Sequence, residues 1–147
     1  MIVAEVNMKE ISFVMIKPGF LQHEKAIVER LEKVGTITKR KQMRLSDKIL
    51  SEHYAEHVGK PFYAGLCEYM KSGDVVAFQV EGEEGLIAKI RALCGATKNP
   101  AEGTIRHDFG IGETTRNVIH SSDSPKAGVE ECERMFKCQK CCCENCQ

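Results

Sequence analysis

The order of apolar runs along the chain constrains its fold more than any other feature of the sequence. Two runs are apolar and partly β-branched, ISFVMI at 11–16 and DVVAFQVEG at 74–82, and both predict buried strands. TITKRKQMRL at 36–45 predicts a weaker strand, and NVI at 117–119 predicts a short last one. Four strands separated by segments of another periodicity therefore form the framework of the expected fold.

The intervals between these runs show helical spacing. Apolar residues recur every three or four positions in segments 26–35, 46–58, 62–73, 83–95 and 125–137. The order strand, helix, strand, helices, strand, helix, strand, helix predicts an α+β protein with a ferredoxin-like βαββαβ fold. We expect a four-stranded antiparallel sheet with the helices packed on one face.

Length and charge limit the functions open to the chain. Its 147 residues predict one main domain, and 21 Lys and Arg balance 21 Asp and Glu. Because proteins that hold nucleic acid are usually basic, we do not expect a nucleic-acid partner. No apolar stretch is long enough to cross a membrane, and the N-terminus lacks the pattern of a secretory signal. We therefore expect a cytoplasmic protein with no membrane partner, in which the eight cysteines are mostly thiols.

The last strand ends on His120, which is followed by the small polar residues SSDS at 121–124. A histidine in this place is often no more than a satisfied polar residue, and that interpretation stays open. Ser124 followed by Pro125 is a strong helix start, and Glu131 lies far enough into that helix to turn back toward His120. A carboxylate bound to one ring nitrogen would leave the lone pair of the other nitrogen free. The pattern therefore favours a histidine nucleophile, and such nucleophiles most often attack phosphorus.

Cations that could hold phosphate occur near the predicted strand ends. Lys17 ends the first strand, Arg91 lies on the helix before segment 95–115, and Thr97 and Arg106 lie within that segment. The segment has no sustained periodicity and predicts a long loop, which in a compact domain is usually functional. Each cation taken alone could be a solvated surface residue. Their shared position at strand ends and in this loop favours a phosphate site.

Over residues 10 to about 137 the chain resembles the nucleoside diphosphate kinases. VMIKPG resembles the first strand and lysine of that family, and GATKNPAEGTIRHDFG resembles its nucleotide-binding loop. EHYAEHVGKPFYAGLCEYMKSGDVVAFQVEG resembles its helical hairpin and next strand, and RNVIHSSDS its active-site signature. The resemblance implies a ping-pong transfer of the γ-phosphate of ATP, through phosphohistidine, to another nucleoside diphosphate. It also implies that Mg²⁺ accompanies the nucleotide, held by phosphates and water with no protein ligand, and that the enzyme maintains nucleoside triphosphate pools.

The resemblance also implies a role for each matching residue. His120 would be the nucleophile, Glu131 the group that orients it and Tyr54 a neighbour of the nucleophile. Lys17 would contact the γ-phosphate and, with Asn117, the sugar 3′-hydroxyl. The remaining residues would bind the phosphates or the base: Arg91, Thr97 and Arg106 the β- and γ-phosphates, and Phe62 and Thr114 the base.

Several positions depart from the family pattern. The loop near His23 to Lys25 and the segment between Pro100 and Gly103 are shorter than usual, which affects parts that pack against other subunits. Among homo-oligomers we favour a hexamer, with a tetramer as the alternative. Ser121 replaces a glycine, so we expect an additional oxygen close to the nucleophile.

The two ends of the chain differ from the middle. We divide it into an N-terminal extension at 1–9, the kinase domain at 10–137 and a Cys-rich tail at 138–147, with Met8 as an alternative start. The tail thiols either bind zinc or form a mobile, oxidation-prone end. The paired thiols are Cys138, Cys141, Cys143 and Cys146. Two other functions remain as alternatives: a nucleotide- or RNA-binding module on the same fold, and a nucleotide-binding regulator without catalysis.

Overall fold

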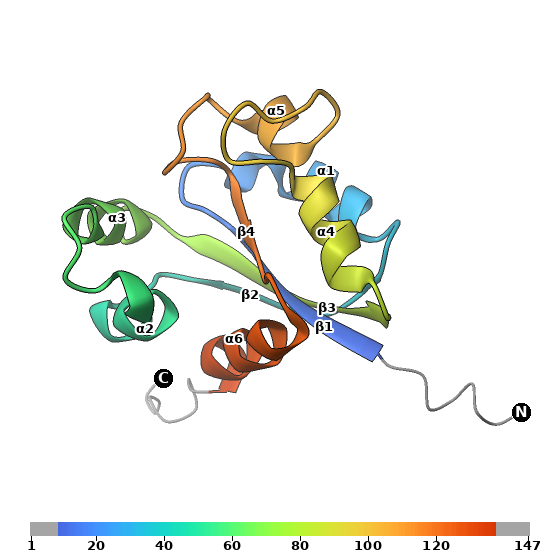
Figure 1. Cartoon of the computed structure of the whole chain (residues 1–147), viewed down its shortest axis with the longest axis horizontal. Helices are drawn as coiled ribbons and strands as arrows, with labels where there is room; N and C mark the ends of the chain where they lie inside the picture. The colour runs from blue at the N-terminus through green and yellow to red at the C-terminus, as the bar shows by residue number, and fades with distance from the viewer. Residues whose placement is uncertain (1–8, 138–147) are drawn as a thin grey trace, which may run out of the picture.

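A four-stranded sheet runs through the middle of the protein (Figure 1). The computed structural model describes residues 9–137, so the Cys-rich tail and all of the N-terminal extension except Lys9 lie outside the described residues. The strands are β1 (Lys9–Ile16), β2 (Thr36–Met43), β3 (Val75–Glu83) and β4 (Ile119–Ser121), in the order β2-β3-β1-β4. All neighbouring strands are antiparallel, which confirms the predicted sheet.

Six α-helices connect and cover these strands within the described residues. They are α1 (Glu24–Leu31), α2 (Asp47–His53), α3 (Tyr63–Met70), α4 (Leu86–Cys94), α5 (Ile105–Phe109) and α6 (Pro125–Lys137), with short 3₁₀ turns η2 (Leu21–His23) and η3 (Ala55–His57). Two predicted helix starts are confirmed by their caps. Ser46 Oγ accepts a hydrogen bond from Ile49 N at 3.2 Å, and Ser124 Oγ accepts one from Ala127 N at 3.1 Å. None of the described helices is both long and apolar enough to span a membrane.

Helices pack on both faces of the sheet, so the expectation that they cover one face is wrong. Val14 and Ile16 of β1 belong to one buried cluster with residues of α1 and α4. Phe13 and Met15 alternate with them and belong to a second cluster with residues of α2, α3 and α6. We call these two sides the α1/α4 face and the α6 face. Figure 1 shows the two groups of helices on opposite sides of the sheet.

The region before β4 differs in two details from its prediction. The loop at 95–115 contains α5, a single turn of helix too short for periodicity to reveal. The predicted strand NVI begins two residues later, at Ile119, because Val118 has a φ of 82°. That left-handed conformation is incompatible with an extended strand and is strained for a β-branched residue.

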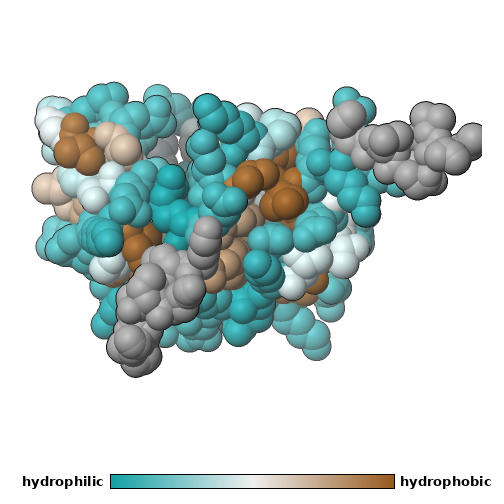
Figure 2. Space-filling model, turned by 90° about the horizontal axis from the view of Figure 1, so that it is seen from below, coloured by the Kyte–Doolittle hydropathy of each residue, from teal (hydrophilic) through white to brown (hydrophobic). Residues whose placement is uncertain are grey.

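Most large apolar side chains lie inside the two clusters. The face in Figure 2 is largely hydrophilic, with hydrophobic side chains in small separate patches. Among the described residues the exposed large hydrophobic side chains are Val58, Phe62, Ile111 and Val129. An exposed aromatic ring such as that of Phe62 is available for a ligand.

Candidate active site

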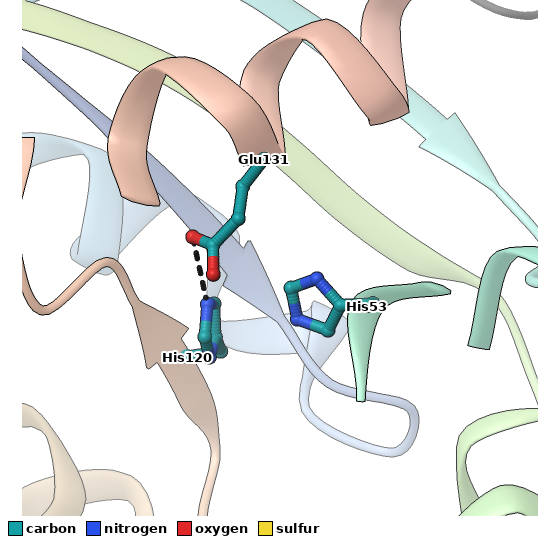
Figure 3. Close-up of side chains that lie close together, drawn as sticks. All are labelled: His53, His120 and Glu131. Carbon is teal, nitrogen blue, oxygen red and sulfur yellow. Dashed lines mark hydrogen bonds and ion pairs between the residues drawn. The ribbon is translucent and has the colours of Figure 1, made fainter. Parts of the chain in front are cut away.

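His120 lies at the centre of β4 and faces α6. It is opposite Met15 in the register of β1 with β4, and both belong to the α6 face. Its Nε2 atom lies 3.2 Å from Glu131 Oε1, a contact shown in Figure 3. The two side chains are 22% and 14% exposed. The sheet register and α6 therefore bring together the histidine and the carboxylate that the sequence paired.

Ser122 holds Glu131 in this position. Its Oγ donates a hydrogen bond to Glu131 Oε1 at 2.7 Å and accepts one from Phe13 N at 2.9 Å. Burial alone would raise the pKa of Glu131, but the hydrogen bonds from His120 and Ser122 and the charge of His120 lower it. Glu131 is therefore ionised at neutral pH and acts only as an acceptor.

The contact with Glu131 fixes the tautomer of His120. Because an ionised carboxylate can only accept, Nε2 of a neutral ring must carry the hydrogen, and Nδ1 keeps the lone pair. Among residues 9–137 no hydrogen bond reaches Nδ1, and in Figure 3 this nitrogen points away from Glu131. The arrangement suits a nucleophile that reacts at Nδ1.

Lys17 is a buried cation beside this ring. Its Nζ donates to Asn117 Oδ1 at 2.6 Å and to Thr115 O at 3.2 Å, and its residue is 8% exposed. Burial, and then the charge of Arg106, lower the pKa of Lys17 to about 8. A buried ammonium ion with two neutral partners is well suited to gain an anionic ligand.

The two arginines occupy different positions. Arg106 donates to Gly95 O at 2.6 Å and to Ile119 O at 2.7 Å, while its buried Nε has no partner among the described residues. Burial lowers the pKa of Arg106, and the charge of Arg91 adds to this effect. Arg91 Nη1 donates to Ser121 O at 3.3 Å, and Arg91 does not line the cavity described next. The structure therefore places Arg106 in the site and Arg91 at its edge.

A cavity of about 290 Å³ brings most of the expected residues together. A second cavity of about 290 Å³ continues from it and shares Thr97, Arg106, Thr114 and Asn117 with it. Phe62 is 53% exposed at the rim, within the same lining as His120. The residues that line the first cavity are Lys17, Tyr54, His57, Phe62, Leu66, Thr97, Arg106, Thr114, Thr115, Asn117, Ile119 and His120.

No pattern in the sequence singled out His53. Its ring lies at 72° to the ring of His120 with the centroids 4.7 Å apart, and both of its ring nitrogens are buried without a hydrogen-bond partner among the described residues. Burial, followed by the charges of His120 and other neighbours, lowers the pKa of His53 to about 3. Burial also raises the pKa of the adjacent Tyr54, so its hydroxyl stays neutral. A histidine in a short helix resembles any surface histidine in sequence, which is why reasoning from the sequence missed it.

Ser122 and Val118 were also missed as parts of the site. Ser122 is one of the small polar residues SSDS at 121–124, and no local signal separated it from its neighbours. Val118 is fully buried and holds its strained backbone directly before Ile119 and His120. Strain of this kind persists where the surrounding structure imposes it, and it is concentrated at functional sites.

The expectation for Ser121 is wrong. Ser121 is opposite Val14 in the register, so its side chain points to the α1/α4 face. There it lies near the thiol of Cys94, whose pKa it lowers slightly against the larger raising effect of burial, on the other side of the strand from the His120 ring. Successive residues of a strand alternate between faces, and the replacement of glycine by Ser121 therefore leaves the nucleophile without an additional oxygen.

Comparisons with known proteins all point to one family. The family model described as nucleoside diphosphate kinase matches residues 10–141. The nucleoside diphosphate kinase of Moorella thermoacetica is 46% identical over 133 residues, covering 86% of this chain and 94% of that protein. The one from Archaeoglobus fulgidus is 44% identical over 133 residues, covering 86% of each. A solved structure, the halophilic nucleoside diphosphate kinase from Halobacterium salinarum in complex with CDP, superposes with a TM-score of 0.81 at 39% identity, covering 88% of this chain and 89% of that one.

Proposed function

The chain belongs to the nucleoside diphosphate kinase family and is a nucleoside diphosphate kinase, and from this premise we propose that His120 carries the phosphoryl group between two nucleotides. One observation carries the proposal: Glu131 holds Nε2 of a ring that also lines a cavity with Lys17 and Arg106. The reactive nitrogen of the ring thus has no hydrogen-bond partner among residues 9–137, and cations lie beside the ring.

In the first half-reaction the Nδ1 lone pair attacks the γ-phosphorus of a nucleoside triphosphate. The bond from that phosphorus to the β–γ bridging oxygen breaks, the nucleoside diphosphate leaves, and an N–P bond forms. The ring becomes cationic, and Glu131 stabilises it through the Nε2–H bond. In the second half-reaction a terminal β-phosphate oxygen of another nucleoside diphosphate attacks this phosphorus, and the neutral ring is restored.

The cations stabilise the charge that spreads over the transferring group. Lys17 contacts the γ-phosphate and, together with Asn117, the 3′-hydroxyl. The 2.6 Å hydrogen bond from Lys17 Nζ to Asn117 Oδ1 supports this shared role. Arg106 and Thr97 line the cavity and bind the β- and γ-phosphates, with Arg91 approaching from the edge. Fixed cations of this kind need no reorganisation during the transfer.

The base lies between Phe62 and Thr114. Both residues line the cavity, and the exposed Phe62 ring offers a stacking surface. Stacking uses the face of a base and ignores the hydrogen bonds of its edge, so one site accepts different bases. The bound substrates of the proposal are therefore ATP and other nucleoside di- and triphosphates.

The cavity fits a nucleotide that carries its own magnesium. Among the described residues the lining of the first cavity has no Asp or Glu, and Glu113 in the lining of the second forms an ion pair with Arg116 at 2.8 Å. The ion would thus be held by phosphate oxygens and water, where it neutralises phosphate charge. The chain's own cations, Lys17 and Arg106, complete that neutralisation.

Assembly, location and domain limits also belong to the proposal. We infer a homo-oligomer, with the hexamer favoured over the tetramer, and a cytoplasmic location, both on the strength of the family. Light scattering of the purified protein measures the first, and cell fractionation the second. We keep 10–137 as the kinase domain, flanked by the segments 1–9 and 138–147.

The test is labelling with ATP radioactive in the γ-phosphate. We expect the full chain to gain an acid-labile, base-stable label that nucleoside diphosphates remove. His120→Ala is expected to abolish the label and lower kcat by about 10⁴-fold or more. His23→Ala, a histidine outside the cavity, is the matched control and should label normally. A label that persists in His120→Ala would show that another residue carries the phosphoryl group.

A further inference from the structure

We propose that His53, His120 and Glu131 together form a Zn²⁺ site that inactivates the kinase by capturing the wrong nitrogen of the catalytic ring. The metal site itself rests on side-chain geometry. Only its effect on phosphorylation rests on the proposed role of His120, and the experiments below separate the two.

The three residues present their ligand atoms to one another from three different elements. His53 ends α2, His120 lies in β4 and Glu131 lies in α6. One ligand atom from each can be chosen so that all lie within 4.8 Å of one another. Figure 3 shows the His53 ring facing the gap between the His120 ring and the Glu131 carboxylate.

These separations are close to those of a tetrahedral zinc site. Zinc binds nitrogen at about 2.0–2.1 Å, which separates neighbouring ligand atoms by roughly 3.3 Å. The distance of 3.2 Å between His120 Nε2 and Glu131 Oε1 already matches this separation. A ligand nitrogen of His53 would need to approach by about 1.5 Å at most. Two imidazoles and one carboxylate are typical zinc ligands and leave a fourth position for water.

His53 is the observation that points to a ligand. Both of its ring nitrogens are buried, and neither has a hydrogen-bond partner among residues 9–137. Buried polar atoms without partners are rare, and each needs an explanation. The ring contacts of His53 are with Phe13, Tyr54 and His120, and none of these satisfies a nitrogen lone pair. A metal ion would satisfy it.

The ion would act on His120 through its tautomer. Coordination uses the Nε2 lone pair, so the ring must change its tautomer: the proton that Nε2 now shares with Glu131 leaves Nε2, and Nδ1 takes up a proton from the solvent. A neutral ring then carries its hydrogen on Nδ1, the atom proposed to attack phosphorus. Nδ1 has no lone pair to offer in that state, and phosphorylation stops although the cavity remains open to nucleotide.

The affinity should be moderate. Glu131 is the single carboxylate of the trio, and Lys17 and Arg134 lie close enough to act on the charge of His53. Nearby cations weaken the binding of a divalent ion. We therefore expect a reversible, inhibitory site and no permanently bound zinc.

The first experiment measures metal binding alone. It uses Co²⁺, which reports its ligands by visible absorption, on the full chain with Cys138, Cys141, Cys142, Cys143 and Cys146 changed to Ser in every sample, so that tail thiolates do not compete. We expect one Co²⁺ per chain, displaced by Zn²⁺. His53→Gln should weaken binding by at least about 10–100-fold, and the matched control His23→Gln should not change it. Equal affinity in His53→Gln and its parent would overturn the proposal.

The second experiment measures inhibition. The same proteins are labelled briefly from γ-labelled Mg–ATP with free Zn²⁺ held constant by a metal buffer. The label should fall about tenfold or more in the parent and in His23→Gln, but not in His53→Gln, while ADP binding persists in all three. Loss of ADP binding with zinc, or equal inhibition of His53→Gln, would show that the ion acts elsewhere.

The two experiments fail in different ways. If His120 is not the phosphorylated residue, Co²⁺ binding still depends on His53, but the amount of phosphoryl label is the same with and without Zn²⁺. If His53→Gln does not fold, which circular dichroism will show, Glu131→Gln takes its place in the Co²⁺ titration. Unchanged Co²⁺ affinity in Glu131→Gln would equally overturn the site.

Discussion

The two faces of the sheet are both covered by helices, but they differ in what they bury. The α1/α4 face packs a cluster made of apolar side chains from β1, β3, α1 and α4. The α6 face packs a second apolar cluster and, beside it, the hydrogen-bonded set of His120, Glu131 and Ser122. The same strand, β1, supplies buried residues to both.

This difference shows how the molecule separates stability from chemistry. Apolar contacts tolerate small shifts, whereas a buried polar group needs a partner at a defined distance and direction. The α6 face therefore depends on the register of β4 and on the position of α6, and the α1/α4 face holds that register in place. Two of the predictions below pair a change on one face with a counterpart on the other, and the other two address charged groups of the site.

The largest expected effects come from core truncations on the two faces. Phe78→Ala on the α1/α4 face should lower the free energy of unfolding by about 3–5 kcal/mol, and Met15→Ala on the α6 face by about 2–5 kcal/mol. Urea unfolding measures both. Only Met15→Ala should also lower kcat per folded molecule, because Met15 lies opposite His120. An equal fall of kcat in Phe78→Ala would remove the distinction between the faces.

Next in size is the orienting carboxylate. Glu131→Gln should lower kcat by about 10–100-fold, because the amide no longer selects the tautomer with hydrogen on Nε2 or stabilises the phosphorylated ring. Steady-state kinetics measure this. Because the pKa of Glu131 is lowered in the folded protein, this carboxylate increases the free energy of unfolding above pH 4.5. The increase is lost as the pH falls through the pKa of Glu131 in the folded protein. Acid unfolding of Glu131→Gln should lack this contribution, and identical acid curves would contradict it.

Two buried serines, one on each face, are expected to change the free energy of unfolding by smaller amounts but in different directions. Ser122→Ala on the α6 face leaves Phe13 N without its acceptor and should lower the free energy of unfolding by about 1–3 kcal/mol. Ser12→Ala, on the α1/α4 face, removes a buried hydroxyl that has no partner among the described residues, and should be neutral or stabilising. Thermal unfolding of both variants makes the comparison. A large loss in Ser12→Ala would mean that its hydroxyl is satisfied.

The smallest expected effect is a pH dependence at Lys17. With its pKa lowered to about 8 by burial and by Arg106, Lys17 loses its charge above that pH, and nucleotide affinity should fall about fourfold from pH 7 to about pH 8.5. The effect on stability has the opposite sign. The pKa of Lys17 in the folded protein lies below the ordinary value of 10.5, so the free energy of unfolding rises as the pH goes from about 8 to 10.5. Calorimetric titration with ADP and urea unfolding across this range measure the two trends. Lys17→Arg is the control that keeps its charge.

Parts of the fold could be read directly from the sequence. Phe13, Val14, Met15 and Ile16 are four consecutive buried residues, and a run without alternation is typical of a strand covered on both faces. The second layer of helices was therefore readable in ISFVMI, although the element order led to an expectation of one layer. In contrast, α5 is too short for periodicity to show, and β4 was misplaced because no local rule foresees a left-handed valine.

The sequence predicted which residues form the site, but not the contacts between them. Lys17 and Arg106 were indicated by their places at a strand end and in the long loop, and Asn117 by resemblance to a family; the structure brings all three to one cavity with His120. Arg91 and Ser121 show the limit of that reasoning, since one stands at the edge and the other faces the opposite side of the sheet. His53 carries no motif that separates it from a surface histidine, so its contact with His120 emerged only from packing.

The sequence by itself determined the alternation of strands and helices, the caps that start α2 and α6, and the residue types available for phosphate. The tertiary structure decided which nitrogen of His120 is held and which face of the sheet carries the chemistry. It also decided that His53 lies beside His120 and Glu131 with no hydrogen-bond partner in the part of the chain that the structure describes. The reason is physical: periodicity and capping act within a few residues, whereas hydrogen bonds depend on distances between β4, α2 and α6. Those distances exist only once the sheet register and both buried clusters have formed.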